Sequence, residues 1–217
     1  MHRITVISAG PGGRGYITAI ALQKAGQCDV IIGTEQQVAT AGHTPGQTVY
    51  RESSIEGIMR LIARHKGRRV GVLVTGDAGI YSLAQKIIER FGKEAVEEII
   101  PGVSSIQVAF ARVREPWLNV RVFSFHGRPL EGLEDILSCD RVAVLCDREN
   151  NAKAVLFALT GPGLFDEARS VYVCRDLTME EERVLEVRSL EDIEGIETGR
   201  REIVLLIKKP GSGDKRL

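Results

Sequence analysis

The sequence predicts an α/β protein. Short β-branched apolar runs alternate with segments of helical periodicity, which is the pattern of strand and helix units built on a largely parallel sheet. Three of the runs end in loops rich in glycine and other small residues, and each loop leads into a helical segment. The chain has 217 residues, 43% of them hydrophobic, which is enough for packed cores in one large domain or two small ones.

The first half follows the pattern most closely. A helix over residues 54–65 carries Ile55, Ile58, Met59 and Ile62 at spacings of three and four, and a glycine closes it. The run 70–75 is apolar throughout, so we expect it at the centre of the sheet, buried on both faces. The expected elements are, in order, strand 3–8, helix 16–25, strand 29–32, helix 54–65, strand 70–75, helix 80–91, strand 96–100 and a helix capped by Ser104 that runs to about residue 112.

The pattern breaks near Glu115-Pro116-Trp117, which we take as a domain boundary. The predicted domains are residues 1–116 and 117–210, and the polar, glycine-rich residues 211–217 are expected to form a disordered tail. The second domain is richer in strands. Its expected elements are strands 121–125, 141–146, 170–175, 183–187 and 202–208, helices 133–137 and 151–159, and a helical turn at 190–193.

Composition excludes several classes of protein. Lys and Arg together number 29, as do Asp and Glu, so no overall charge draws the chain to nucleic acid or to an anionic membrane. No apolar run reaches the roughly 18 residues of a membrane span, and no signal-peptide pattern opens the chain, so we expect a cytoplasmic protein. The four cysteines form no C-x-x-C pair and lie far from the histidines, which predicts structural thiols and no protein-bound metal.

The stretch Gly10–Gly15 fits the dinucleotide fingerprint G-x-G-x-x-G. It follows a strand, precedes a helix, and has Glu35 twenty residues further on, where a ribose-binding acid could lie. Pro11 inside the turn and the longer glycine run argue against this interpretation, and a plain tight turn is the structural alternative.

Two more loops favour a different ligand. Thr75–Tyr81 follows the most apolar strand and Pro101–Ser105 follows the next, and loops at the carboxyl ends of parallel strands gather on one edge of a sheet, where ligands bind. Asp77 suits a ligand with hydroxyls or an amine, or it caps the following helix. No Walker lysine follows these glycines, which argues against a phosphate-cradling loop.

Taken together, Gly10-Pro11-Gly12, Gly76-Asp77-Ala78-Gly79 and Pro101–Ser105 resemble the motifs of the tetrapyrrole methylases, over residues 3–208. The resemblance implies two α/β domains with S-adenosylmethionine in the cleft between them, and a homodimer. One difference is Ala78, where the family commonly has a proline that stiffens the loop.

A narrower resemblance lies in Ser124-Phe125-His126-Gly127-Arg128-Pro129. This run is similar to the branch of the family that methylates carbon 5 of cobalt-precorrin-7 or precorrin-7 in cobalamin biosynthesis, and residues 145–150 and 176–183 fit that branch too. Because the chain stops at Leu217, we expect the stand-alone form, without a second methyltransferase domain.

The resemblance also assigns site residues. It places cofactor contacts at Pro11, Thr75, Gly76, Asp77, Ile80, Tyr81, Ser104, Ser105, Cys146 and Leu177, of which Tyr81 and Leu177 are the weaker additions.

The reaction that the resemblance implies depends on the positioning of the two reactants and requires no nucleophile from the protein. Methyl transfer from a sulfonium is an in-line displacement, so the protein has to position the two reactants and exclude water. His126 is the side chain that would move a proton, because imidazole titrates near neutral pH, although a structural histidine is the alternative. The substrate is a polycarboxylate, and Arg128 first and Arg14 second are expected to bind its carboxylates, whereas Arg112 and Arg114 are expected to be solvated helix-end charges.

Three other interpretations remain open. The chain could be a tetrapyrrole methylase of different regiospecificity, a nicotinamide-dependent oxidoreductase that uses Gly10–Gly15 and Glu35, or a non-enzymatic module that binds an acidic partner through Arg14 and Arg128.

Overall fold

The computed structural model describes residues 1–125, 127, 129–165 and 168–209. The chain forms two compact units, 1–105 and 106–217. The division falls eleven residues before Pro116, where the sequence suggests the boundary, because the helix that follows Pro101–Ser105 is grouped with the second unit. The tail at 211–217 lies outside the described residues.

The first unit is a five-stranded parallel sheet in the order β3-β2-β4-β1-β5. Its strands and helices are β1 (Arg3–Ser8), the 3-10 turn η1 (Arg14–Tyr16), α1 (Ala19–Gln27), β2 (Val30–Gly33), α2 (Glu35–Ala41), β3 (Thr48–Arg51), α3 (Ile55–Arg64), β4 (Arg69–Val74), α4 (Ala84–Phe91), the 3-10 turn η2 (Lys93–Ala95) and β5 (Val96–Ile100).

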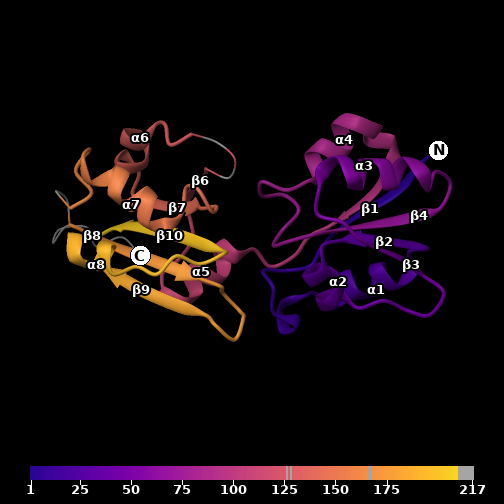
Figure 1. Cartoon of the computed structure of the whole chain (residues 1–217), viewed down its shortest axis with the longest axis horizontal. Coiled ribbons are helices and arrows are strands. Elements are labelled where there is room, and N and C mark those ends of the chain that lie inside the picture. Colours follow the sequence, from indigo (N-terminus) through magenta and orange to yellow (C-terminus); the bar gives the residue numbers. More distant parts are fainter. Residues whose placement is uncertain (126, 128, 166–167, 210–217) are drawn as a thin grey trace. The chain divides into compact units, whose positions relative to one another are not determined.

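Side-chain alternation along the strands builds a core on each face of this sheet. Ile4 and Val6 pack with residues of α3 and α4, whereas Ile7 packs with residues of α1 and α2. Figure 1 shows the resulting layers, with α3 and α4 on one face and α1 and α2 on the other. The central strand β4 is buried at every position after Arg69, which confirms the expectation from its continuous apolar run.

The direction of the connections changes between β1 and β4. From β1 the chain moves outward to β2 through α1 and to β3 through α2. From β3 it returns through α3 to the central strand β4, and α4 then connects β4 to β5 on the other side of β1. The loops after the neighbouring strands β1 and β4 therefore lead to helices on opposite faces. Such a topological switch point is where open α/β sheets bind their ligands, at the carboxyl ends of the strands.

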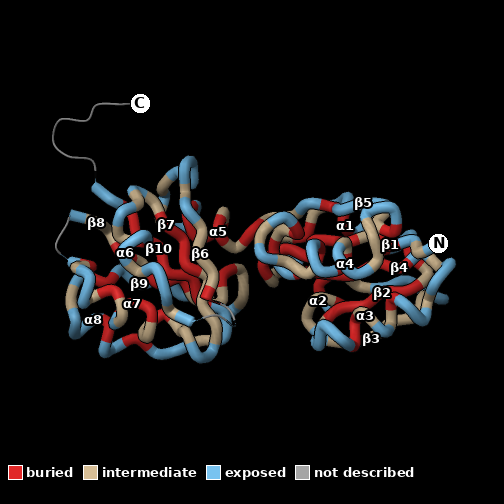
Figure 2. The backbone as a smooth tube through the Cα atoms, turned by 90° about the horizontal axis from the view of Figure 1, so that it is seen from above, coloured by how far each residue is buried: buried red, intermediate tan, exposed pale blue. Residues whose placement is uncertain are grey.

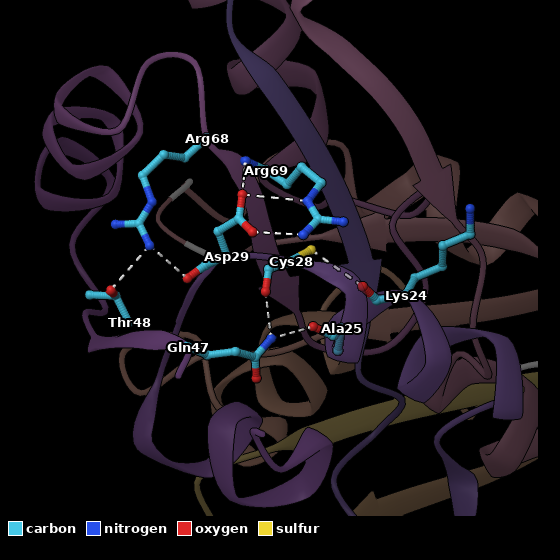
Figure 3. A network of polar contacts seen from close by, with 8 residues as sticks. All are labelled: Lys24, Ala25, Cys28, Asp29, Gln47, Thr48, Arg68 and Arg69. Atoms are coloured by element: carbon cyan, nitrogen blue, oxygen red, sulfur yellow. Dashed lines mark hydrogen bonds and ion pairs between the residues drawn. The ribbon is translucent and has the colours of Figure 1, made fainter. Parts of the chain in front are cut away.

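A polar network closes the opposite, amino-terminal edge of the sheet (Figure 3). The Asp29 carboxylate accepts hydrogen bonds from the Arg69 backbone N–H (2.9 Å) and from its guanidinium (2.7 Å), and these bonds lower the pKa of Asp29 to about 2. The Gln47 amide donates to the carbonyls of Ala25 and Cys28 (2.8 and 2.7 Å). The starts of β2, β3 and β4 are thus tied together far from the switch point.

The second unit has a mixed sheet in the order β6-β7-β10-β8-β9, in which β6 and β7 are parallel and the other pairs are antiparallel. Its core gathers Ile136, Leu156 and Ile193 from three helices over the sheet, and Figure 2 shows the buried residues of these strands and helices in red. Its elements are α5 (Ser105–Val113), β6 (Arg121–Ser124), α6 (Leu133–Ser138), β7 (Arg141–Leu145), α7 (Ala152–Thr160), β8 (Arg169–Arg175), β9 (Arg183–Val187), α8 (Leu190–Glu194) and β10 (Glu202–Lys208).

The structure confirms the α/β class and corrects some elements. Helix α1 begins at Ala19 instead of residue 16, and α4 at Ala84 instead of residue 80, because an irregular loop precedes each of them. Helix α2 and strand β3 are not among the elements expected from the sequence. All four cysteines are free thiols, and no helix of the described part is long and apolar enough to cross a membrane.

Candidate cofactor site

The loop after β1 is folded tightly against the loop after β4. Gly10 and Gly76 form an isolated bridge in which the Gly76 N–H donates to the Gly10 carbonyl (2.8 Å). Gly10 has φ of +73°, and a Cβ atom there would lie 2.8 Å from the Tyr16 carbonyl oxygen. This position therefore requires glycine because of both its backbone conformation and the close approach of the chain.

The rest of this loop does not have the geometry of a dinucleotide fingerprint. The third glycine of that motif serves close packing of a helix on the strand, but Gly15 lies in η1 with no heavy atom within 4 Å of a Cβ built on it. Helix α1 starts four residues later, and the Thr18 side chain accepts a hydrogen bond from the Ala21 N–H at its N-terminus. Part of the N-terminal donor set that would receive a pyrophosphate is thus already occupied by the protein.

Asp77 joins the loops after β4 and β5. One carboxylate oxygen accepts from the Gly79 N–H and the other from the Gly102 N–H, both at 2.8 Å. The alternative that Asp77 caps the next helix is wrong, because α4 begins at Ala84 with Leu83 at its N-cap position. The carboxylate of Asp77 instead holds the loops after β4 and β5 together.

Ser8, the last residue of β1, completes this junction and was missed in the sequence. Its buried hydroxyl accepts a hydrogen bond from the Ala78 N–H (2.9 Å). A Cβ at Gly102 would lie 2.5 Å from the Cβ of Ser8, so the loop after β5 approaches β1 as closely as backbone allows. The three glycine-containing loops form one connected structure at the switch point.

Gln37 on α2 also reaches this structure and was missed. Its side-chain amide donates to the Thr75 hydroxyl (2.9 Å) and accepts from the Thr34 N–H (2.7 Å). The sequence signal was available, because Thr34 and Gln37 have the spacing of a capping box and form one at the start of α2.

Eight of the predicted cofactor residues lie on the loops after β1, β4 and β5. Pro11 and Ser104 are buried, Thr75 is exposed, and Tyr81 is 54% exposed with φ of +44°, a conformation that non-glycine residues adopt most often at special sites. The eight are Pro11, Thr75, Gly76, Asp77, Ile80, Tyr81, Ser104 and Ser105. Arg14, predicted to bind substrate, lies exposed in η1 of the same β1 loop.

The remaining two cofactor residues lie at one edge of the second sheet. Cys146 follows β7 and Leu177 follows β8, and these strands run parallel to one another on either side of β10. Cys146 donates its backbone N–H to the carbonyl of Glu202, the first residue of β10 (3.1 Å). Burial raises the pKa of the Cys146 thiol, and the nearby Glu202 carboxylate raises it further, so the thiol is neutral.

The loop after β6 reaches the same edge. Gly127 donates its N–H to the Asp147 carboxylate (2.7 Å), and the Asn150 amide donates to the Phe125 carbonyl (3.0 Å). Both of these partners belong to the loop after β7, so the two loops are held together. His126 and Arg128, the predicted proton-moving and substrate-binding residues, lie outside the described residues.

An ion pair supports the loop that carries Leu177. The Nε atom and one terminal nitrogen of Arg112 donate to the Glu182 carboxylate, which also accepts from the Thr178 N–H (2.6 Å). The hydrogen bond from Arg112 lowers the pKa of Glu182. The expectation that Arg112 is merely a solvated charge is therefore wrong. Arg114, at the exposed end of α5, fits that expectation.

Across the described ranges, no three His, Cys, Asp or Glu side chains are placed to hold a metal ion together.

Comparison with known proteins identifies the class. A sequence model of the family described as Tetrapyrrole (Corrin/Porphyrin) Methylases matches residues 3–194. The chain belongs to this family, and it is a methyltransferase.

The individual proteins that the chain resembles have low sequence identity to it. The cobalt-precorrin-7 C(5)-methyltransferase of Salmonella typhimurium is 26% identical over 181 residues, which cover 83% of this chain and 88% of that protein. Among solved structures, a cobalamin biosynthesis precorrin-6Y methylase from Archaeoglobus fulgidus matches 97% of this chain and 100% of its own, with a TM-score of 0.71 and 23% identity. A uroporphyrin-III C-methyl transferase from Thermus thermophilus, solved in complex with S-adenosylhomocysteine, matches 94% and 92%, with a TM-score of 0.73 and 19% identity.

Proposed function

We propose that this protein transfers a methyl group from S-adenosylmethionine to carbon 5 of cobalt-precorrin-7 or precorrin-7, a step of cobalamin biosynthesis. The observation that carries the proposal is the junction of three glycine-containing loops at the switch point of a tetrapyrrole methylase. The position on the ring is supported by the Ser124–Pro129 run and by the C(5)-methyltransferase relative from Salmonella.

The residues at the junction fit the adenosyl cofactor. Gly10 and Gly76 have positive φ angles and carry no side chain that could obstruct a ligand, and the exposed Thr75 hydroxyl adds a polar group. Such a set suits the uncharged ribose and the zwitterionic amino-acid portion of this ligand better than a pyrophosphate. When bound, the cofactor supplies an electrophilic methyl on a sulfonium, and the loops hold it in line with the acceptor carbon and exclude water.

The state of Cys146 also fits. A thiolate is a strong nucleophile and would compete with the ring carbon for the methyl group. Because burial raises its pKa, Cys146 remains a thiol, which acts as a small apolar contact in the second unit.

For the tetrapyrrole we propose binding by Arg14, His126 and Arg128. Guanidinium groups pair with the carboxylates of the substrate, and His126 accepts the proton that is released when the sulfonium methyl is transferred to carbon and S-adenosylhomocysteine leaves. We further propose that the protein works as a cytoplasmic homodimer, as the resemblance implies, which analytical ultracentrifugation tests directly.

The decisive experiment is incubation of the purified protein with methyl-¹³C S-adenosylmethionine and cobalt-precorrin-7, followed by carbon NMR. A new methyl on carbon 5 is expected. A methyl on another carbon would overturn the proposed position of methylation but not the methyltransferase activity. The absence of any transfer would overturn the proposed activity on this substrate.

The nicotinamide alternative has its own readout. Calorimetric titration with S-adenosylhomocysteine and separately with NADH should give binding of the former alone. The geometry of Gly15 and of the capped α1 supports this expectation. Tight binding of NADH alone would favour the oxidoreductase, and no binding of either would favour a non-enzymatic module.

A further inference from the structure

We infer that Gln37 is a positioning residue that fixes the direction of the Thr75 hydroxyl, so that this hydroxyl donates a hydrogen bond to an acceptor atom of the adenosyl cofactor. The inference deepens the proposed function and rests on it. It adds to the site a residue of α2, an element that carries none of the family motifs quoted above.

The orientation of the Gln37 amide follows from the backbone. The Thr34 N–H can only donate, so the atom 2.7 Å from it has to be the Gln37 carbonyl oxygen. The NH₂ group of the same amide is therefore the one that faces Thr75, with its nitrogen 2.9 Å from the hydroxyl oxygen. No choice between the two amide orientations remains.

This arrangement determines what Thr75 can offer. An amide NH₂ group donates hydrogen bonds and cannot accept them. The Thr75 oxygen is therefore the acceptor of this bond, and its own proton points elsewhere. Within the described residues, no acceptor for that proton is found, and Thr75 is exposed. The residue thus presents one directed donor beside the Gly10–Gly76 bridge, where the cofactor is proposed to bind.

The support behind Gln37 is rigid. The Thr34 hydroxyl accepts from the Gln37 N–H (3.3 Å), which completes the capping box, and α2 packs onto the sheet through Val38. Holding the hydroxyl before the ligand arrives reduces the entropy lost on binding. The structure therefore predicts that Gln37 contributes to cofactor affinity through Thr75.

The substitution Gln37→Glu tests this directly. A carboxylate keeps the length of the side chain and one oxygen for the Thr34 N–H, and an acid is favourable in the first turn of a helix. Its second oxygen can only accept, so Thr75 has to turn its proton toward residue 37 and present lone pairs to the cofactor. We expect an unchanged melting temperature and a loss of roughly tenfold or more in affinity for S-adenosylhomocysteine by calorimetry.

A double-mutant cycle separates this effect from the added charge. Thr75→Val removes the donor and should weaken binding by about three- to tenfold, whereas Thr75→Ser should bind like the parent. In the Thr75→Val background, Gln37→Glu should cost no more than Gln36→Glu, which adds the same charge one residue away.

Each outcome has a clear meaning. Coupling between positions 37 and 75 supports the inference. If Gln37→Glu lowers the affinity for S-adenosylhomocysteine equally in the parent and in the Thr75→Val background, or in neither, the inference is overturned. The proposed function would still stand in that case, provided that the parent protein binds S-adenosylhomocysteine. Failure of the parent protein to bind S-adenosylhomocysteine would overturn the proposed function and this inference with it.

Discussion

Asp77 follows strand β4 in the first sheet, and Asp147 follows strand β7 in the second. Both carboxylates already accept hydrogen bonds from the backbone of the protein. Asp77 accepts from the N–H groups of Gly79 and Gly102, and Asp147 accepts from those of Gly127 and Asn150. Each aspartate therefore ties the loop after its own strand to a neighbouring loop. Loops fixed in this way are organised before ligand arrives, which lowers the entropic cost of binding.

Substitution of Arg128 tests whether this residue binds the carboxylates of the substrate. Arg128→Ala should raise KM for the tetrapyrrole about tenfold or more and change kcat less, because a bidentate guanidinium contact to a carboxylate contributes mainly to binding. Arg128→Lys should recover only part of this, since an ammonium cannot make the paired contact.

A matched control is Arg121→Ala, at the first residue of β6, which should leave KM unchanged. Equal KM values for the Arg128→Ala variant and the parent would show that this arginine does not bind the substrate.

At the residue scale, motifs predicted which loops form the candidate site but not how these loops are held. Asp77 was predicted as a ligand contact, and its two backbone bonds depend on the loop after β5, which is distant in the sequence. Ser8 reads as an ordinary small residue at a strand end, and only the fold brings Ala78 to it. Gln37 was within reach of prediction, because its capping-box spacing is local.

At the scale of elements, most strands were predictable, whereas α2 and β3 were not. Strands β1, β5, β9 and β10 have the predicted bounds, because hydrophobic periodicity alone defines them. The segments α2 and β3 are short and carry few apolar residues, so their structure depends on packing against the sheet rather than on local pattern.

The two ends of the Gly10–Gly15 motif should respond differently to alanine. Gly10→Ala should destabilise the protein by about 2 kcal/mol or more, because φ is positive there and the new Cβ meets the Tyr16 carbonyl. Gly15→Ala should change stability by less than about 0.5 kcal/mol, since open space surrounds it. Urea denaturation followed by circular dichroism measures both.

The comparison also bears on the ligand. In a dinucleotide fingerprint the third glycine is needed for the helix to pack on the strand. A large loss of stability for Gly15→Ala would therefore argue against the fold described for this loop.

The Asp29–Arg69 pair predicts a dependence of stability on pH. The folded-state pKa of Asp29 is lowered to about 2 from its ordinary 3.8, chiefly by hydrogen bonds from Arg69. The stabilisation is therefore complete above about pH 4 to 5 and is lost as the pH falls toward 2. The effect should be small, because the side chains of Asp29 and Arg69 are 35% and 47% exposed.

The measurement is the free energy of unfolding of the parent and of Asp29→Asn at pH 6, 4 and 3. The parent should be the more stable at pH 6, and the difference should shrink at pH 3. A difference that stays constant or grows toward pH 3 would contradict this account of the network in Figure 3.

For the whole molecule, each unit packs its own sheet, and the predicted cofactor residues follow strands that end at one edge of that sheet. In the first unit this edge follows from parallel strands and a switch in connection direction, and in the second from the parallel arrangement of β6, β7 and β8 around an antiparallel β10. Family motifs scattered between residues 10 and 177 thereby collect into two groups of loops. Neither group is apparent from the order of the sequence.

The junction of Ser8, Asp77 and Gly102 also sets when the site can form during synthesis of the chain. Strand β1 pairs Arg3 with Arg69 and Ile4 with Val96, so its neighbours emerge from the ribosome long after it does. Closing such long segments is slow and has an entropic cost, and nothing local holds the first loop in its final shape meanwhile. The nascent chain cannot assemble this junction of loops until β5 and Gly102 have been made, although the first of the loops is among the earliest residues synthesised.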